Sequence, residues 1–381
     1  MNQPADIIAF CKDWHEPKTS NNHILEELAK RHRVLWVNSI TTRSPDFGST
    51  NDLKKIWRKI RSWLAGVQVI HERLRVLTPV VLPFPRSRAA QRFNRCLTRA
   101  LVRRTARRWG FRQPQLWIFP PNAVDYVGQF GESKVIYYCV DEWSQFTHLN
   151  TEFILQKERE LLAKADAVFV VSQKLLAKHP GAHLIPHGVN FDLFAASGPI
   201  ATELASLPHP IIGFYGNLYD WVDQELIATL ATLRPHWSFV LVGKIMTDVS
   251  QLRLLNIHLP GPRRYEDLPS YCHGFDVGII PYRMSDPRMQ SVNPLKLREY
   301  LAAGLPVVSV NLPEARPLAK YVRFAATPDE FVQQIEATLA QDTPALRQQR
   351  SAAMRSESWS ARAEQVERVL AERPAPQKGP V

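Results

Sequence analysis

Residues 293–310 read NPLKLREYLAAGLPVVSV, and their pattern decides the expected fold class. Apolar residues recur at helical spacing over Leu295–Ala303, and the apolar run Val307–Val310 follows after a short turn. Val-rich runs that directly follow helices are typical of parallel sheets with both faces covered. This stretch therefore predicts a helix followed by a strand of a parallel α/β sheet.

The same alternation of apolar runs and helical periods extends toward both ends of the chain. Such an order of elements predicts doubly wound sheets, which bind ligands at the carboxyl ends of their strands. The expected strands are Asp6–Cys11, Arg33–Asn38, Gln115–Phe119, Lys134–Cys139, Asp166–Val171, Leu184–Pro186, Ile211–Tyr215, Ser238–Val242, Ile257–Leu259, Val277–Pro281 and Val307–Val310. The expected helices are Ser20–Arg31, about Glu152–Lys164, one from about Val222, Tyr265–His273, Leu295–Ala303 and Thr327 to about Ala340.

Residues 187–210 interrupt this alternation with Gly and Pro and show little periodicity, which indicates a connection between two domains. The expected fold class is therefore α/β, with two doubly wound, Rossmann-like domains that face each other across a cleft. The expected divisions are an N-terminal domain at 1–190 with a basic insert at about 52–112, a connection at 191–209, a C-terminal domain at 210–355, a C-terminal helix at 356–372 and a disordered tail at 373–381.

The positive charge of the chain is concentrated in one segment. The formal net charge is +12, from 48 basic and 36 acidic residues. Between Leu53 and Arg112, 17 Lys or Arg stand against one acid, Glu72, which gives +16, so the rest of the chain carries 12 − 16 = −4. A local excess of this size indicates a surface with a specific use rather than a general aid to solubility.

Two amphipathic helices are expected inside the basic segment, one at Leu53–Leu64 and one at about Phe93–Trp109. One interpretation is a peripheral membrane surface, where apolar side chains enter the headgroup boundary and cations meet anionic lipid. Alternatively the helices pack on a core with solvated cations, attract an acceptor with a phosphate group, or bind nucleic acid. A specific nucleic acid is not expected, because RNP, zinc-finger and KH signatures are absent. The candidate membrane-facing residues are Trp57, Arg58, Lys59, Trp63, Arg103 and Arg104.

Four cysteines, far apart and without a CxxC pair, exclude a disulfide scaffold and a cysteine-based zinc cluster. The N-terminus lacks the features of a signal peptide, and no apolar run approaches the ~20 residues of a membrane span. We therefore expect a cytoplasmic protein, peripheral at the inner face of the cytoplasmic membrane.

Motifs of several other enzyme classes are missing. No GxGxxG follows the first expected strand, Gly243 and Lys244 lack the rest of a Walker loop, and HExxH, GxSxG and a DxD carboxylate pair are absent. We therefore predict no cofactor and no metal. A bound diphosphate would have to be neutralised by Lys or Arg, backbone N–H groups and helix dipoles.

Four stretches occur in order in the C-terminal half, namely FYGNL at 214–218, LVGK at 241–244, DVGIIPY at 276–282 and NPLKLREYLAAGLPVV at 293–308. With ADAVFVVS at 165–172 and IPHGVN at 185–190, they resemble GT-B glycosyltransferases of the "group 1" type over about residues 5–340. The resemblance implies the GT-B architecture, a nucleoside-diphosphate sugar donor of the UDP or GDP type, and a sugar or lipid-linked acceptor in surface polysaccharide or glycolipid synthesis.

Donor binding is expected at strand ends and at the helix that begins near residue 293. Gly216 follows a strand, and its missing Cβ lets the backbone approach a diphosphate. Lys296 lies one turn inside the helix, so its ammonium and the helix N-terminus can both address phosphate oxygens. By resemblance, Glu299 accepts hydrogen bonds from the ribose hydroxyls; the alternative is an ion pair with Lys296. Further donor-binding candidates are Asn217, Lys244, Tyr282 and Asn293.

One position departs from the family pattern. Many relatives carry a Glu at the position of Ser291, eight residues before Glu299, and its loss leaves open the sugar contact and the retaining stereochemistry that usually accompany it. Asp141 follows an expected strand, and some inverting GT-B enzymes use an Asp in a similar context to deprotonate the acceptor. Asp141 is thus a candidate base, or alternatively an N-cap. Asp13 and His23 are further catalytic candidates.

The sequence thus predicts a metal-independent glycosyltransferase, inverting if Asp141 is the base. One alternative is a GT-B-fold epimerase that acts on the sugar nucleotide itself and forms product without an acceptor. The other is a non-catalytic adaptor, which would bind anionic vesicles or nucleic acid without binding a nucleotide.

Overall fold

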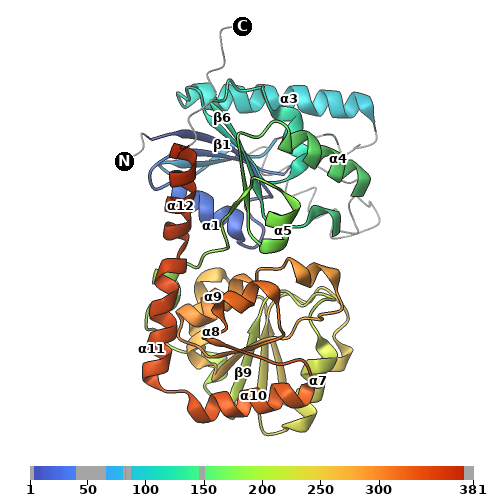
Figure 1. Cartoon of the computed structure of the whole chain (residues 1–381), viewed down its shortest axis with the longest axis vertical. Coiled ribbons are helices and arrows are strands. Elements are labelled where there is room, and N and C mark those ends of the chain that lie inside the picture. The colour runs from blue at the N-terminus through green and yellow to red at the C-terminus, as the bar shows by residue number, and fades with distance from the viewer. Residues whose placement is uncertain (1–3, 40–65, 80–81, 83–86, 146–150, 373–381) are drawn as a thin grey trace. The chain divides into compact units, whose positions relative to one another are not determined.

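The computed structural model describes residues 4–39, 66–79, 82, 87–145 and 151–372, which form two compact units (Figure 1). The first unit comprises Met1–Val171, Leu175–Ile185 and Ala363–Val381, and the second comprises Ser172–Lys174 and Pro186–Arg362. Helix α12 (Trp359–Glu372) therefore starts in the second unit and ends in the first. The expected helix at 53–64 and the tail at 373–381 lie outside the described residues.

The first unit contains, among its described residues, an eight-stranded sheet in the order β3-β4-β2-β1-β5-β6-β7-β8. Every neighbouring pair is parallel except the antiparallel β3–β4 hairpin. Strands β1, β2 and β6 are buried along almost their whole length, as expected for strands covered on both faces. The strands are β1 (Asp6–Phe10), β2 (Arg33–Val37), β3 (Val67–His71), β4 (Leu74–Leu77), β5 (Gln115–Ile118), β6 (Lys134–Cys139), β7 (Ala167–Val170) and β8 (His183–Leu184). The helices are α1 (Ser20–Leu28), α3 (Arg88–Arg108), α4 (Thr151–Leu162) and α5 (Gln173–Lys178).

The second unit contains a six-stranded parallel sheet in the order β11-β10-β9-β12-β13-β14. The central strands β9 and β10 are buried at every position. Because all strands point the same way, their carboxyl ends gather at one edge, where ligands of such domains bind. The strands are β9 (Ile211–Tyr215), β10 (Ser238–Val242), β11 (Ile257–Gly261), β12 (Val277–Ile280), β13 (Val307–Ser309) and β14 (Val322–Phe324). The helices are α6 (Phe191–Ala195), α7 (Gln224–Leu233), α8 (Leu268–Gly274), α9 (Leu295–Ala302), α10 (Pro328–Gln341) and α11 (Pro344–Ala353).

The structure confirms the expected alternation of strands and helices and adds strands that the periodicity missed. The hairpin β3–β4 lies inside the basic segment, where β3 is largely exposed and lacks a buried face to mark it. Strand β14 has only three residues, too short for any period to be read. Both additions lie at or beside a sheet edge, where burial imposes the weakest pattern on the sequence.

Candidate active site

The carboxyl ends of β9 and β10 approach each other closely at two glycines. The Gly216 N–H donates a hydrogen bond to the Val242 carbonyl over 2.8 Å. A Cβ on Gly243 would lie 2.0 Å from the Gly216 carbonyl oxygen, so a side chain is excluded there. Gly216 itself has φ +143°, a conformation that side chains rarely adopt. Glycine is therefore required at this edge for the close packing of the two strand ends. Without side chains, the backbone of both glycines stays uncovered there.

Lys296 lies against this backbone. It is the second residue of α9 and is half-buried, and a Cβ on Gly216 would lie 3.2 Å from its Nζ. The ammonium donates a hydrogen bond to the Tyr282 hydroxyl and lies 5.1 Å from the centre of the Phe214 ring. Among the described residues, no carboxylate lies within 4.0 Å of this Nζ. A cation stabilised by neutral groups beside a helix N-terminus is suited to bind an anion.

Glu299, one turn further along α9, is buried and does not pair with Lys296 in the part of the chain that the structure describes. Its Oε2 accepts a hydrogen bond from the Tyr215 hydroxyl over 2.8 Å. Burial raises the pKa of Glu299, and hydrogen bonds from Tyr215 and Tyr265 partly offset this rise. The alternative of an ion pair with Lys296 is therefore not formed among the described residues, and Glu299 bonds to a tyrosine of β9, a partner that sequence spacing did not reveal.

The remaining donor-binding candidates occupy different environments. Asn217 is half-buried beside the two glycines, and Lys244 is exposed just beyond β10. Tyr282 is buried, with its hydroxyl bonded to Lys296. Asn293 is buried just before α9, and its Oδ1 accepts a hydrogen bond from Arg298 over 2.7 Å, so its side chain holds the start of the helix. The structure thus groups Gly216, Asn217, Tyr282 and Lys296 and gives Asn293 a structural bond.

Asp141 lies in the first unit, directly after β6, with its side chain exposed. The protein around Asp141 displaces part of the water that would hydrate its carboxylate, which raises the pKa to about 7. Because the side chain is exposed, the remaining water reduces this shift. Among the described residues its carboxylate caps no helix: the turn at Trp143–Gln145 instead has Ser144 bonded to Glu142. The Asp141 carbonyl accepts a hydrogen bond from the Cys139 thiol over 3.3 Å, which ties the residue to the end of the strand.

Asp13 lies just beyond the carboxyl end of β1, and His23 lies in α1. Asp13 Oδ1 accepts hydrogen bonds from the backbone N–H (3.0 Å) and hydroxyl (2.7 Å) of Ser39, which link the loops after β1 and β2. His23 is buried, and burial with the nearby Lys18 and Lys12 lowers its pKa to about 3. The imidazole is therefore neutral at physiological pH and does not act there as a cationic acid.

Lys12 follows β1 and was not among the site residues predicted from the sequence. Burial lowers the pKa of Lys12 to about 8, although nearby Glu16 favours its charged form. Its ammonium donates a hydrogen bond to the Pro17 carbonyl. The position of Lys12 at a strand end was a signal that the sequence offered, because side chains at such ends gather at the binding edge of a parallel sheet.

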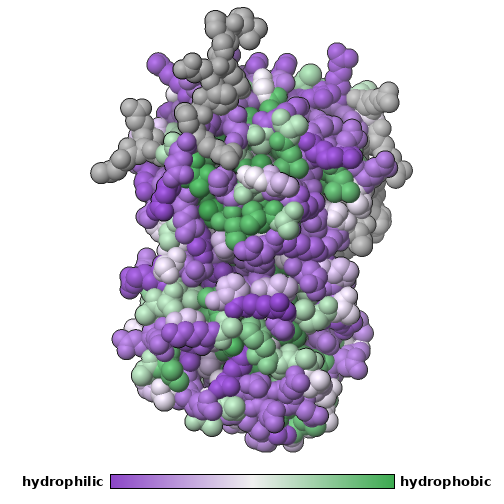
Figure 2. Space-filling view, in the orientation of Figure 1, coloured by the Kyte–Doolittle hydropathy of each residue, from purple (hydrophilic) through white to green (hydrophobic). Residues whose placement is uncertain are grey.

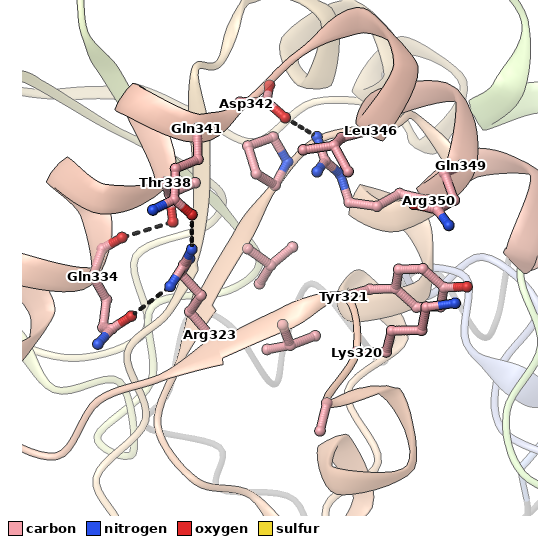
Figure 3. A pocket seen from close by; sticks show the side chains of 14 residues that line it. Lys320, Tyr321, Arg323, Gln334, Thr338, Gln341, Asp342, Leu346, Gln349 and Arg350 are labelled. Atoms are coloured by element: carbon pink, nitrogen blue, oxygen red, sulfur yellow. Dashed lines mark hydrogen bonds and ion pairs between the residues drawn. The ribbon is translucent and has the colours of Figure 1, made fainter.

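A cavity of about 490 Å³ lies elsewhere in the second unit, near Pro306 and Tyr321, which precede β13 and β14 (Figure 3). Its guanidinium groups are already engaged: Arg323 bonds to Gln334 and Gln341, and Arg350 pairs with Asp342. The cavity lies at the amino ends of the strands, opposite the edge where α/β domains bind ligands and where the donor-binding candidates lie.

Helix α3 presents basic side chains to solvent. Its N-cap is Ser87, whose hydroxyl accepts a hydrogen bond from the Ala90 N–H, and Ala90, Thr98, Val102 and Ala106 form its buried face. Phe93 is 51% exposed, so part of the expected apolar stripe does not pack on the core. Hydrophilic side chains predominate along this helix on the visible face (Figure 2). The exposed cations of the helix include Arg92, Arg95, Arg103, Arg104, Arg107 and Arg108, whereas Trp57, Arg58, Lys59 and Trp63 lie outside the described residues.

Comparisons with known proteins agree with this architecture. Residues 209–341 match the family of glycosyl transferases group 1. The chain is 32% identical over 274 residues to a putative teichuronic acid biosynthesis glycosyltransferase, TuaH, of Bacillus subtilis, a match that covers 64% of this chain and 68% of TuaH.

Two solved structures share the fold over nearly their whole length. Sucrose-phosphate synthase from Thermosynechococcus elongatus superposes with a TM-score of 0.68 at 16% identity, covering 97% of this chain and 99% of the synthase. Anabaena HepE in complex with UDP and glucose gives a TM-score of 0.67 at 14% identity, covering 96% and 99%. The architecture is thus that of the GT-B glycosyltransferases. The chain belongs to the group 1 glycosyltransferases and is a glycosyltransferase enzyme. No helix of the described residues is long and apolar enough to cross a membrane.

Proposed function

We propose that this glycosyltransferase transfers a sugar from a nucleoside diphosphate, bound at the carboxyl ends of β9 and β10, to an acceptor hydroxyl. The observation that carries the proposal is the position of Lys296. Its ammonium lies beside the bare backbone of Gly216, at a helix N-terminus, and its contacts within the described chain are neutral. This arrangement supports binding of a diphosphate. The diphosphate is the leaving group of the reaction and gains negative charge during transfer.

Diphosphate binding at this site would not require a metal. Lys296 supplies a full charge, and the first N–H groups of α9 supply hydrogen-bond donors and the positive end of the helix dipole. Glu299, fixed by Tyr215, would accept hydrogen bonds from the ribose as the family resemblance implies. HepE, a protein of the same fold, is described in complex with UDP and glucose, which supports a donor of this class.

We assign Asp141 the role of general base. It follows a strand end and its carboxylate forms no hydrogen bond within the described chain that would occupy it. A direct displacement with Asp141 accepting the proton of the acceptor hydroxyl would invert the anomeric centre. Asp13 and His23 are further catalytic candidates. Asp13 would hold its loop through the bond to Ser39, and His23 would act as a neutral imidazole.

The acceptor is proposed to be lipid-linked, in synthesis of a surface polysaccharide, and the enzyme to be peripheral at an anionic membrane. The exposed arginines of α3 and the exposed Phe93 of the same helix support this assignment. TuaH is named for teichuronic acid biosynthesis, a function of the same class. Sedimentation with vesicles containing anionic lipid tests this part: binding should fall as salt rises and weaken when Arg103 and Arg104 are both changed to Ala.

The donor site is tested with a panel of UDP- and GDP-sugars, scored by thermal shift and by diphosphate release in the presence of a lipid-linked acceptor. Lys296→Ala should reduce kcat/KM for the active donor by about 100- to 1000-fold, as expected for loss of a charged group that stabilises the transition state. Lys320→Ala is the matched control, because Lys320 is exposed in the same unit at the opposite edge of the sheet. Equal activity of the two variants would contradict the assignment.

A further inference from the structure

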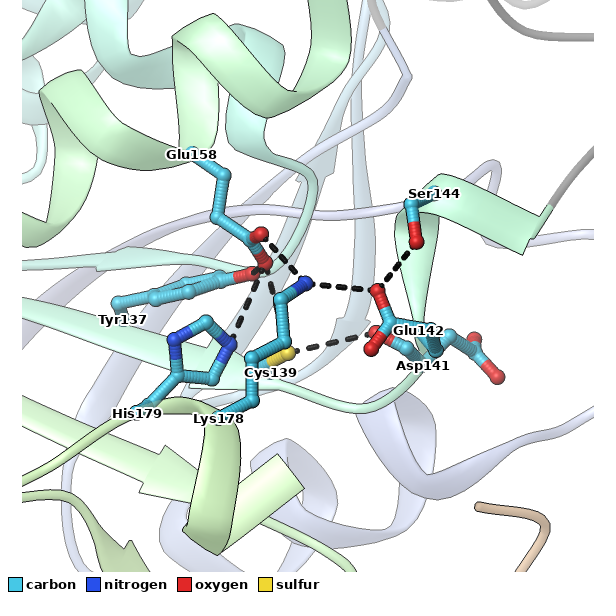
Figure 4. Close-up of polar contacts among 8 residues, drawn as sticks. All are labelled: Tyr137, Cys139, Asp141, Glu142, Ser144, Glu158, Lys178 and His179. Carbon is cyan, nitrogen blue, oxygen red and sulfur yellow. Dashed lines mark hydrogen bonds and ion pairs between the residues drawn. The ribbon is translucent and has the colours of Figure 1, made fainter. Parts of the chain in front are cut away.

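A buried polar cluster lies at the carboxyl end of β6 in the first unit (Figure 4). Cys139 ends the strand, Glu158 comes from α4, and His179 follows α5. All three side chains are buried. The Cys139 Sγ lies 4.0 Å from Glu158 Oε1, and the His179 Nε2 lies 3.6 Å from the same oxygen.

These atoms form a compact set of metal-binding groups. Sulfur, nitrogen and oxygen all lie within 4.8 Å of one another. In a tetrahedral zinc site with bonds of about 2.0–2.3 Å, neighbouring ligand atoms lie about 3.3–3.6 Å apart. The two distances to Glu158 Oε1 therefore need to shorten by only a few tenths of an ångström, which rotations of the three side chains can supply.

His179 supplies an independent sign of a missing ligand. Its Nε2 is buried and has no hydrogen-bond partner among the described residues, because Glu158 at 3.6 Å is too distant. A buried polar atom without a partner costs free energy, and native structures rarely leave one without a reason. The Nε2 atom points toward the Glu158 carboxylate (Figure 4).

The charges of the cluster leave room for a cation. The Lys178 ammonium contacts Glu142 over 2.6 Å and Glu158 over 2.9 Å. The same ammonium thus contacts both carboxylates. Two carboxylates then face one ammonium, which leaves one negative charge. A divalent metal with one thiolate adds one positive charge and balances the cluster.

We propose that Cys139, Glu158 and His179 bind a zinc ion. The donor set of one sulfur, one nitrogen and one oxygen suits zinc, which accepts soft and hard ligands together. Binding expels the proton of the Cys139 thiol to solvent, and Glu158 Oε1 coordinates while its Oε2 remains bonded to Lys178. This site is distinct from the proposed donor site and places no metal on the diphosphate.

The position of the ion gives it a structural consequence. It would join the end of β6 to α4 and to the residue after α5, three elements that are separate in the sequence. Cys139 also contacts the backbone of Asp141 through its sulfur. Zinc would therefore order the strand end that precedes Asp141 and stabilise the first unit.

The test uses the full chain, stripped with a chelator and then titrated with zinc chloride. We expect one zinc per chain by elemental analysis after buffer exchange, and a rise in Tm on zinc addition. Replacement of zinc by cobalt should give a sulfur-to-cobalt charge-transfer band in the near ultraviolet. Cys139→Ser and His179→Gln should each weaken zinc binding at least about 100-fold. Even residues that only hydrogen-bond to the ligands of a metal contribute 10- to 100-fold to its affinity.

Cys96→Ser is the matched control, because Cys96 is an exposed cysteine of the same unit and should leave zinc binding unchanged. Should Cys139→Ser not fold, the cobalt spectrum of the unaltered chain and the zinc affinity of His179→Gln decide the question. Substoichiometric zinc in the unaltered chain, a cobalt spectrum without the sulfur band, or full zinc affinity in a folded Cys139→Ser or His179→Gln variant would overturn the proposal.

Discussion

Two polar groups in this enzyme differ in how their charges are satisfied. In the second unit, Lys296 is a half-buried cation whose described contacts are a hydroxyl and aromatic rings. In the first unit, Lys178 bridges two carboxylates, and the adjacent Nε2 of His179 lacks a hydrogen bond among the described residues. The first group has positive charge to spare and suits an anion, whereas the second has negative charge to spare and suits a cation. Charge balance, rather than residue type, therefore indicates what each site binds.

The largest expected effect is on turnover. Asp141→Asn should lower kcat by about 100- to 10 000-fold, because a positioned general base contributes that much to a transfer reaction. Donor binding, measured by thermal shift with the nucleotide sugar, should stay unchanged, since the proposed donor-binding residues lie in the second unit. Asp125→Asn serves as control, because Asp125 pairs with Lys157 at the surface of the same unit. Turnover within threefold of the unaltered enzyme would remove Asp141 from the reaction.

Substitution of Lys178 and substitution of Lys296 should differ most clearly in their effect on the stability of the fold. Lys178→Met leaves Glu158 buried without its ammonium, so the free energy of unfolding should fall by about 3 kcal/mol, the low end for breaking a buried pair, because Lys178 keeps contact with water. Lys296→Ala should change it by less than about 1 kcal/mol, since no described carboxylate depends on Lys296. Urea unfolding monitored by tryptophan fluorescence measures both, and a more destabilising Lys296→Ala would reverse the comparison.

Gly216→Ala should affect both stability and donor binding. Its φ of +143° and a Cβ 3.1 Å from Lys296 Cε both disfavour a side chain. We expect a loss of about 1–2 kcal/mol in unfolding free energy and a KM for the donor raised about tenfold as the ammonium is displaced. Gly181→Ala is a control for conformation alone, because Gly181 has φ +83° with no atom within 4 Å of a Cβ. A raised donor KM in Gly181→Ala as well would show that the effect is not local.

At neutral pH the smallest expected effect comes from His23, whose contribution to stability changes only below about pH 6.5. Its pKa is lowered to about 3, so between about pH 6.5 and 3 the unfolded chain binds a proton that the folded chain does not. Stability is therefore lost as pH falls through this range, with a contribution of up to about 1.4 kcal/mol per pH unit from this residue. His23→Gln should make the decline of the unfolding free energy below pH 6.5 shallower by up to that amount, as measured by urea unfolding at several pH values. An unchanged slope would mean that other groups control acid unfolding.

Much of the candidate donor site could be predicted from the sequence, because its residues follow local rules. Gly216 comes directly after a strand, and Lys296 is in the first turn of a helix, so their places at the binding edge follow from element order. The partners of Glu299 and Asn293 could not be predicted. Glu299 bonds to Tyr215 in another element, and Asn293 holds Arg298 rather than a ligand, outcomes that depend on how α9 packs against β9.

The α/β class, the order of most strands and helices, and the concentration of positive charge could be predicted from short-range patterns, because periodicity and composition act over a few residues at a time. Only the tertiary structure brought Cys139, Glu158 and His179 together and buried them beside Lys178. Each of these residues comes from or follows a different element, and no spacing along the chain resembles a metal motif. Contacts of this kind depend on the packing of distant segments, which short-range patterns do not encode.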